Sequence, residues 1–314
     1  MICSLCKRDT KVIIANRLRS GEARDVYHCP VCDLGILQSD MTEEQYKEYY
    51  ENEYRKFHKP VLGKTTNARQ LFDLNVKFQH DRISLLKPFL NKKMKLLELG
   101  CSAGQFLHSV KPYVGQIYGY DLDKKALRFA RRHVGCIEWD ERKKGFDVIC
   151  MFQVMEHVQE PLKYLEKIKQ CLDPNGIVMV EVPNLKDSLI AAYDLPNHFQ
   201  FYFHKAHLWY FTETSLKKLM RQAGFDGKIY FTQDYSMMNH MHWLINDKPQ
   251  NSCEEGLSSP SLPLRISATK SLDAAKRSLD LFIKESDLRY KQLLIKHGIS
   301  SNITFIGRIS KAKR

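Results

Sequence analysis

The hydrophobic residues of this chain fall into short apolar runs that alternate with amphipathic segments. Apolar runs bounded by turn residues predict buried strands, here at 94–101, 116–121, 136–139, 146–152, 177–182, 227–233 and 303–309. Segments with helical periodicity predict helices at 104–111, 124–133, 161–172 and 213–223. Strands that alternate with helices imply a Rossmann-like, doubly wound α/β sheet of seven strands. A ligand of such a sheet binds at the carboxyl ends of its first strands.

The segments around this core predict additional structure. Residues 41–54 and 65–90 favour helices, and the tyrosines of the first would lie over the ligand as a lid or pack on the core. The Ser/Pro-rich stretch 247–263 predicts a mobile loop, and a long helix at about 268–297 would cap the active site or contact a second copy in a homodimer. The predicted domains are a ribbon at 1–38, a helical linker or lid at 39–93, an α/β core at 94–234, a helical insertion before the last strand at 235–300, and the last strand with a basic tail at 301–314.

The most informative stretch contains the pattern Glu98-x-Gly100-x-x-x-Gly104 between a predicted strand and a helix. Glycine lets the backbone N–H groups of such a turn approach a ligand closely. Asp121 ends the next strand, where its carboxylate can accept hydrogen bonds from both hydroxyls of a ribose. Ser102 stands where a dinucleotide fold has its second glycine, which disfavours a pyrophosphate. The pattern favours a nucleoside with an amino-acid tail; the alternative is a tight turn in an unrelated α/β domain.

Motifs further along the chain have the order and spacing of a known family. They are Glu156-His157 after a strand, Pro161 at a helix start, Asp173-Pro-Asn-Gly176 after that helix, and a strand that ends in Pro183-Asn184. With the glycine turn, they resemble class I S-adenosylmethionine (SAM) methyltransferases of the type 11/23 group, over roughly Asn75 to the C-terminus. The resemblance implies the methyltransferase version of the Rossmann-like fold and SAM as cofactor.

The resemblance also implies which residues hold SAM. Glu98 and Gly100 should meet the methionine end, and Asp121 should take the ribose hydroxyls. Leu122 should pack on the adenine, and Asp140 lies where the family contacts the adenine amino group. The residues expected at the cofactor are Glu98, Gly100, Cys101, Gly104, Asp121, Leu122, Asp140 and Gln153, the last along the methionine portion.

Four of the nine cysteines form two C-x-x-C pairs, Cys3 with Cys6 and Cys29 with Cys32, with 22 residues between the pairs. Two such knuckles can close a tetrahedral thiolate site for Zn²⁺, and the segments around them predict a small zinc ribbon. Four thiolates leave no open position, so the zinc should be structural. A pair of redox dithiols is the rival interpretation, although such motifs sit on a βαβ unit. The remaining cysteines are scattered in apolar runs, which is typical of a reducing compartment.

Methyl transfer from a sulfonium needs an aligned nucleophile and a base for its proton, a role that suits histidine. The candidates are His207, His204 and His157, with His207 preferred because its loop should roof the substrate cavity. The run His204-Lys-Ala-His207-Leu-Trp-Tyr-Phe resembles deoxysugar C-methyltransferases, which also carry an N-terminal zinc site. Phe203 replaces the tyrosine of their Tyr-His-Glu-His run, and two residues instead of one separate the histidines, so O-methylation of a sugar fits better. The candidate substrate residues are Asn239, His240 and Trp243.

The formal charge of +13, from 49 basic and 36 acidic residues, is compatible with an anionic partner such as nucleic acid or a phosphorylated sugar. The basic residues are spread over helix ends and faces, which favours a solvated surface. No window holds 18 uninterrupted apolar residues, so no membrane span is expected. Cys3 and Cys6 do not suit a signal peptide, which favours a cytoplasmic location.

The sequence therefore favours a cytoplasmic SAM-dependent methyltransferase that resembles enzymes of bacterial surface-polysaccharide and sugar-modifying pathways. Its acceptor should be a small molecule, a nucleotide-sugar or a glycan, with or without a phosphate. The first alternative is an RNA methyltransferase that uses the ribbon to bind RNA, with an affinity that falls steeply with salt. The second alternative is a non-catalytic SAM-binding scaffold.

Overall fold

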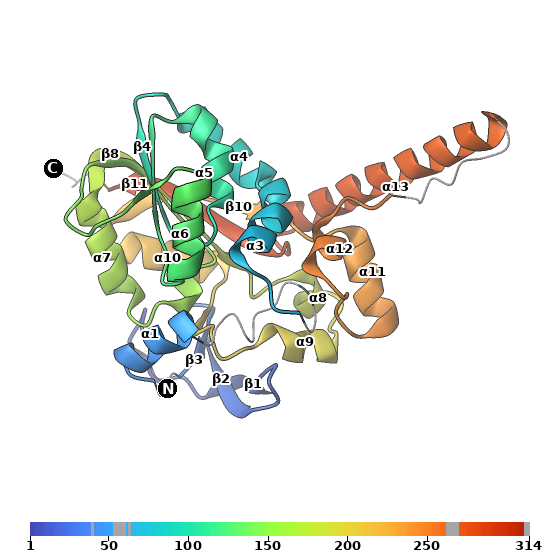
Figure 1. Cartoon of the computed structure of the whole chain (residues 1–314). Helices are drawn as coiled ribbons and strands as arrows, with labels where there is room; N and C mark the ends of the chain where they lie inside the picture. The colour runs from blue at the N-terminus through green and yellow to red at the C-terminus, as the bar shows by residue number, and fades with distance from the viewer. Residues whose placement is uncertain (39–40, 53–60, 62–63, 262–269, 311–314) are drawn as a thin grey trace.

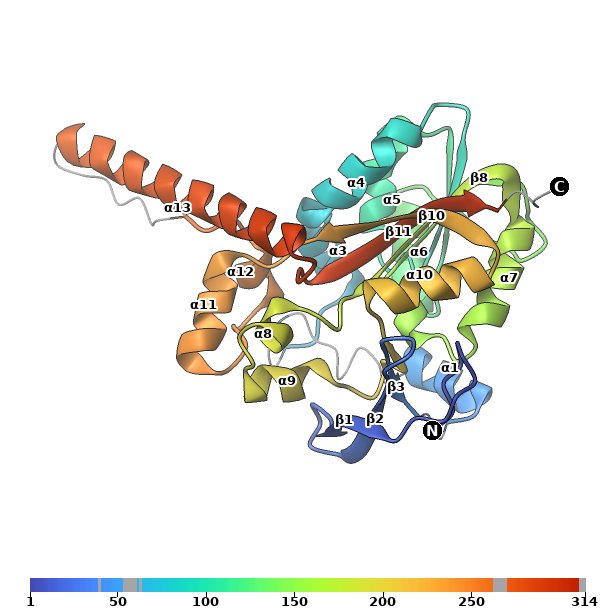
Figure 2. The same ribbon diagram turned by 180° about the vertical axis from the view of Figure 1, so that it is seen from behind.

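The computed structural model describes residues 1–38, 41–52, 61, 64–261 and 270–310 (Figure 1). A large twisted sheet with helices on both faces forms the body of the molecule. A smaller N-terminal sheet packs below it, and one long helix projects outward (Figures 1 and 2). None of the helices within these ranges is long and apolar enough to cross a membrane.

The large sheet has seven strands in the order β10-β11-β8-β7-β4-β5-β6. The strands are β4 (Lys95–Leu99), β5 (Gln116–Tyr120), β6 (Ile137–Glu138), β7 (Phe146–Phe152), β8 (Leu172–Pro183), β10 (Phe225–Thr232) and β11 (Asn302–Ile309). Strands β4 to β8 pair in parallel, whereas β11 is antiparallel to both β8 and β10. The seven-stranded, Rossmann-like sheet is therefore confirmed, with one reversed strand that makes it mixed.

Helices cover both faces of this sheet, which explains why its strands are almost continuously apolar. Leu96 and Val148 point to one face and Leu97 and Ile149 to the other, as the period of two in a strand requires. The first face packs against α3 (Ala68–Asn75), α4 (His80–Leu86), α5 (Gln105–Val110) and α6 (Lys124–His133). The second packs against α7 (Pro161–Cys171) and α10 (Glu213–Gln222).

The N-terminal sheet consists of β1 (Val12–Arg17), β2 (Ala23–Cys29), β3 (Leu34–Leu37) and β9 (Trp209–Tyr210), in that order. Strand β9 comes from the loop after β8 and pairs Tyr210 with Gly35. Leu34 and Ile36 of β3 are buried in the same apolar cluster as β8 and α10. The predicted ribbon is thus completed by a short strand from the loop after β8, and β3 packs into the same apolar cluster as the large sheet.

One predicted helical segment is wrong, and another is confirmed over the residues that the structure describes. The single helix expected at 65–90 is wrong: it is divided into α3, η1 (Val76–Phe78), α4 and η2 (Lys87–Phe89). The break occurs at Gln79, which has a non-helical ψ of 1° and donates its side-chain amide to the carbonyl oxygen of Asn75. The helix expected at 41–54 is present as α1 (Glu43–Asn52), and residues 53 and 54 of the expected helix lie outside the described ranges.

The insertion before β11 contains α11 (Met237–Asn246), α12 (Cys253–Leu257) and α13 (Lys270–Lys296). The expectation of a loop throughout 247–263 is wrong because α12 forms there, with the Ser252 side chain accepting a hydrogen bond from the Glu255 N–H as an N-cap. Residues 262 and 263 of that stretch fall outside the described ranges. The expected long helix is confirmed as α13. The remaining short elements are η3 (Lys111–Tyr113), η4 (Met155–His157), α8 (Ser188–Ala191) and α9 (Pro196–Tyr202).

Candidate functional site

The glycine turn connects β4 to α5 at the carboxyl edge of the sheet. Gly100, Ser102 and Gly104 have left-handed backbone conformations, with φ of 76°, 48° and 84°. A Cβ atom on Gly100 would lie 2.5 Å from Cγ2 of Val154, so the segment after β7 packs directly on the turn. Glycine at position 100 is therefore required both by its φ and by this close approach.

Two carboxylates lie beside the turn, as expected for a cofactor site. Glu98 is 4% exposed, and its Oε2 atom has no hydrogen-bond partner. Burial raises the pKa of Glu98 to about 8, and the nearby Asp121 carboxylate adds to the rise. Asp121 accepts hydrogen bonds from the backbone N–H groups of Ser102 and Asp123, both at 2.7 Å, and so fixes the turn. A buried carboxyl oxygen without a partner fits a ligand that brings a hydrogen-bond donor with a positive charge.

The other cofactor candidates occupy different environments. Leu122 is partly buried directly after β5. Cys101 is 1% exposed, and its backbone N–H donates to Tyr120 O at 3.0 Å, so its side chain is part of the core. Asp140 is exposed and pairs with Arg142 at 2.5 Å, which lowers the pKa of Asp140 to about 2.

Gln153, the last cofactor candidate, belongs to a network that the sequence analysis did not identify. Its Nε2 donates to Glu181 Oε1 at 3.2 Å and to Asn302 Oδ1 at 3.1 Å. Glu181 Oε1 also accepts hydrogen bonds from Arg82, at 3.0 Å from Nε and 2.5 Å from Nη2. Asn302 donates to Asp234 Oδ2 at 2.7 Å. The network joins the carboxyl ends of β7, β8 and β10 to the first residue of β11 and to α4.

The position of Glu181 within an apolar run is the sequence feature that predicts this network. Glu181 is 2% exposed and stands inside the otherwise apolar run 177–183 of β8, whereas the Arg82 side chain keeps 20% exposure. A buried carboxylate needs a cation or several donors, so Glu181 was a signal for a polar site. Burial raises the pKa of Asp234 to about 6, and the charge of Glu181 contributes to this rise.

The three predicted base candidates come together beside η4. Nε2 of His157 and Nε2 of His207 lie 3.9 and 3.8 Å from Oε1 of Glu156. The ring centroids of His204 and His207 are 3.7 Å apart. Nδ1 of His157 lies 2.8 Å from the carbonyl oxygen of Ala206, and burial lowers the pKa of His157 to about 4.

Glu156 is the member of this cluster to which sequence analysis gave no role. It is fully buried, and neither carboxyl oxygen has a hydrogen-bond partner. Burial raises the pKa of Glu156 to about 8, so the carboxyl group exchanges a proton near neutral pH. The ligand atoms of Glu156, His157 and His207 lie within 4.8 Å of one another, so the cluster can hold a cation or share a proton.

The three candidate substrate residues lie on α11 and make buried contacts. His240 is fully buried, with Nδ1 2.7 Å from the hydroxyl oxygen of Tyr290 on α13. Asn239 donates to Gln250 Oε1 at 2.8 Å. Trp243 is 4% exposed and packs edge-on against a histidine ring of α9. These contacts join α11 to α13 and α9.

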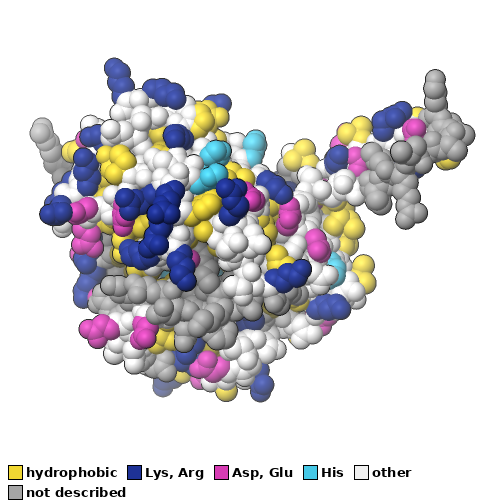
Figure 3. Space-filling model, in the orientation of Figure 1, with side chains coloured by type: hydrophobic (Ala, Val, Ile, Leu, Met, Phe, Trp, Pro, Cys, Tyr) yellow, Lys and Arg dark blue, Asp and Glu magenta, His cyan; other side chains and the backbone are white. Residues whose placement is uncertain are grey.

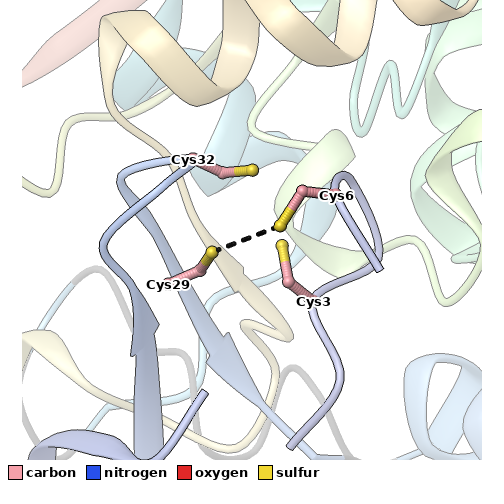
Figure 4. Close-up of side chains that lie close together, drawn as sticks. All are labelled: Cys3, Cys6, Cys29 and Cys32. Atoms are coloured by element: carbon pink, nitrogen blue, oxygen red, sulfur yellow. Dashed lines mark hydrogen bonds between the residues drawn. The ribbon is translucent and has the colours of Figure 1, made fainter. Parts of the chain in front are cut away.

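The four N-terminal cysteine side chains converge on one point (Figure 4). All four sulfur atoms lie within 4.8 Å of one another, and the Cys6 and Cys29 sulfurs are 3.6 Å apart. A tetrahedral zinc site with bonds of about 2.3 Å separates its sulfurs by about 3.8 Å, so this arrangement fits Zn²⁺. Lys218 of α10 places Nζ 3.1 Å from the Cys32 sulfur, where its charge would offset that of zinc-bound thiolates.

Comparison with curated proteins gives relatives of low identity. The ubiquinone biosynthesis O-methyltransferase of Roseobacter denitrificans is 26% identical over 156 residues, which cover 45% of this chain and 62% of that protein. The enzyme of the same description from Dinoroseobacter shibae is 27% identical over 151 residues, 43% of this chain and 61% of its own. The chain thus spans about three fifths of the length of these relatives.

Comparison with solved structures also gives matches of low sequence identity. A SAM-dependent methyltransferase from Archaeoglobus fulgidus has a TM-score of 0.46 and 16% identity, covering 76% of this chain and 99% of that one. The phosphoethanolamine N-methyltransferase 2 of Haemonchus contortus also has a TM-score of 0.46, with 14% identity, covering 88% of this chain and 62% of that one. The family model described as "Methyltransferase domain" matches residues 68–227, about half of the chain. This match includes the glycine turn, Asp121 and the Glu156 cluster, and it shows that the chain belongs to the methyltransferase domain family.

Proposed function

We propose that this protein transfers the methyl group of SAM to a hydroxyl of a polyhydroxylated acceptor, a sugar or a sugar-bearing metabolite. The observation that carries the proposal is the cluster of Glu156 and His157, just after β7, with His207 from the loop before β9. Glu156 and His157 follow Val154, which packs on the cofactor turn at Gly100. A base and a methyl donor would therefore meet at the carboxyl edge of the sheet.

The residues of the turn support SAM as the methyl donor. The buried Oε2 of Glu98 suits an ammonium group, and the Asp121 carboxylate, directly after β5, is a hydrogen-bond acceptor of the kind that suits ribose hydroxyls. Leu122 suits packing on the adenine. When bound, SAM supplies a methyl group on a positively charged sulfur, which makes the methyl carbon electrophilic.

The histidine cluster supports proton removal from the acceptor. His207 would take the hydroxyl proton on Nε2 while the hydroxyl oxygen forms its bond to the methyl carbon, and the electrons of the broken carbon–sulfur bond stay on sulfur. Glu156 lies 3.8 Å from that Nε2, and although burial raises its pKa to about 8, its ionised form would stabilise the imidazolium that forms. Burial lowers the pKa of His157 to about 4, so this ring stays neutral at physiological pH. Its Nδ1 atom hydrogen-bonds the carbonyl oxygen of Ala206, which is next to His207 in the chain.

The network around Glu181 supports a hydroxyl-rich acceptor. Arg82, whose side chain is 20% exposed, and the partly buried Asp234 place charged groups at the edge where the acceptor would approach. Such groups lose hydrogen bonds to water when an apolar ligand covers them, and keep them when the ligand supplies hydroxyls. A hydroxylated aromatic acceptor is the second candidate, because the relatives are named ubiquinone biosynthesis O-methyltransferases.

The cysteine cluster supports a structural zinc ion. Four thiolates would fill the coordination sphere, so the metal would fix the ribbon and take no part in methyl transfer. Without metal, burial raises the pKa of Cys3 to about 12. Zinc binding would displace that proton and contribute its binding free energy to the folding of the ribbon.

The decisive experiment transfers isotope-labelled methyl from SAM into a host-cell extract that is then separated into RNA, protein, glycan, lipid and small-molecule pools. We expect label in the glycan or nucleotide-sugar pool. His207→Ala should reduce the transfer rate about 100-fold or more with SAM affinity unchanged. His80→Ala is the matched control, because the His80 side chain is 87% exposed on α4.

Other outcomes would redirect the assignment. Label in a quinone fraction would support the aromatic acceptor, and label in RNA would support a nucleic-acid substrate. SAM binding without label in any pool would indicate a scaffold and remove the proposed role of His207.

A further inference from the structure

The first part of α13 is an arm that extends away from the body of the protein. The helix has 27 residues and is therefore about 40 Å long. Its C-terminal part is anchored: Asp287 accepts a hydrogen bond from the Met237 N–H at 2.6 Å, Tyr290 contacts His240, and Leu294 is 5% exposed. The part before Asp287, residues 270–286, is called the arm here, and it stands clear of the large sheet in both views (Figures 1 and 2).

The insertion contains most of the uncovered apolar surface. Of seventeen large hydrophobic side chains that are exposed in the described ranges, eleven lie between Tyr235 and Ile295. On and beside the arm, Leu279 is 56%, Leu281 56%, Phe282 66% and Leu288 59% exposed. Hydrophobic side chains are visible along the arm in the space-filling view (Figure 3). Such a concentration of exposed apolar side chains marks an interaction surface.

The arrangement of these side chains around the helix indicates what covers them. Leu279 and Phe282 share one face, flanked by the small residues Ala275 and Ser286 at the four–three–four spacing of a helix–helix seam. Leu281 lies about 200° from Leu279 around the helix. Its neighbours on that opposite face are Arg277, Lys284 and Glu285, so this face carries charges of both signs. A helix that lies on a membrane has one apolar face and one basic face. The charges of both signs on this arm instead favour a protein partner for its apolar face.

We propose that α13 is a dimerisation arm and that its partner is a second copy of this chain. In a two-fold pair, the two arms run antiparallel and pack Leu279 of each against Phe282 of the other. The same register brings Ala275 opposite Ser286, so large residues face each other and small residues face each other. Because the interface is isologous, one self-complementary surface supplies both halves of the contact.

The length of the arm allows a second contact between the two copies. With the two-fold axis between Leu279 and Phe282, Lys270 of each arm reaches the level of residue 291 of the other copy, which lies beside α11. That helix exposes Met238 by 47%, Leu244 by 38% and Ile245 by 79%. The tip of each arm would cover this part of the other copy. Two contacts are needed, because a stable interface buries about 800 Å² on each partner, more than a few side chains of one seam provide.

The test is the oligomeric state of the full chain, measured by analytical ultracentrifugation over a range of concentrations. We expect a dimer for the unchanged protein and at least a tenfold weaker association for the double variant L279E/F282E. Ile245→Glu should weaken association independently at the second contact. Ile137→Glu is the matched control, because this side chain is 48% exposed on β6, far along the sheet from the insertion. Far-UV circular dichroism should show the same fold for all variants, since the altered side chains are exposed.

Hydrogen–deuterium exchange provides a second readout on the unchanged protein. Amides of 272–286 should be protected at high protein concentration and exchange faster on dilution. A monomer at all concentrations would overturn the proposal, as would a double variant that associates like the unchanged protein. Arm exchange that does not depend on concentration would overturn it as well.

Discussion

Replacing the buried carboxyl of Glu98 with an amide should change how stability depends on pH. Glu98 is 4% exposed, and burial raises its pKa from 4.5 to about 8. The native state therefore holds the proton of Glu98 at pH values where the unfolded chain has released it. Glu98→Gln has nearly the same shape as the protonated form and cannot ionise.

The sign and size of the effect follow from proton linkage. Between pH 4.5 and about 8 the native state binds more protons at Glu98 than the unfolded state, so the free energy of unfolding falls as pH rises. At about 1.4 kcal/mol for each pH unit, the loss reaches about 3 kcal/mol at pH 7 and about 5 kcal/mol above pH 8. The contribution is fully present below pH 4.5. The Glu98→Gln variant should lack this slope.

The assay is urea unfolding of both proteins at a series of pH values without SAM. We expect the stability of the unchanged protein, relative to Glu98→Gln, to fall by about 3 kcal/mol from pH 4.5 to pH 7. Glu166→Gln is the control, because Glu166 is exposed on α7. A stability difference between Glu98→Gln and the unchanged protein that stays constant with pH would refute the reasoning. Calorimetry in buffers of different ionisation enthalpy adds a second check, since SAM binding at pH 7 should release a proton only when Glu98 is present.

Three further predictions concern the turn, the ribose and the ribbon. Asp121→Ala should weaken SAM binding more than tenfold, or about 1.4 kcal/mol, in calorimetry where exposed Asp73→Ala has no effect; equal affinities would contradict the ribose assignment. Gly100→Ala should lower the free energy of unfolding by about 2–4 kcal/mol through φ strain and the clash with the Val154 side chain. Gly145→Ala, with φ of 75° and no atom within 4 Å of its Cβ position, should show only the φ part, and equal losses would count against the clash. Metal analysis should find one zinc per chain, and the Cys29→Ser variant should contain none. Removal of the metal by a chelator should lower Tm. If protein purified under reducing conditions without chelator contains no zinc, the site is excluded.

The turn and the sheet could be predicted because local chemistry fixes them. Gly100 and Gly104 adopt left-handed φ values that cost free energy for residues with a Cβ atom. The apolar runs of β4 and β7 remove their side chains from water only when both faces of the sheet are covered. The four cysteines were equally informative, since the C-x-x-C spacing predicts a knuckle without reference to the rest of the chain. In each case the signal lies within a few neighbouring residues.

The contacts between distant residues could not be predicted in this way. Arg82 and Glu181 are 99 residues apart, and nothing near either residue in the sequence identifies its partner. The break at Gln79 and the placement of α12 also depend on how neighbouring segments pack, because the helical tendency of a short segment is weak compared with tertiary contacts.

The sequence by itself therefore determined the fold class, the cofactor turn and the cysteine site, because each depends on conformations and spacings of adjacent residues. Only the tertiary structure placed Glu156 between His157 and His207, added β9 to the N-terminal sheet and showed α13 as an exposed arm. The physical reason is that burial, pKa and exposure depend on what surrounds a side chain. Those surroundings come from residues that are distant in the sequence.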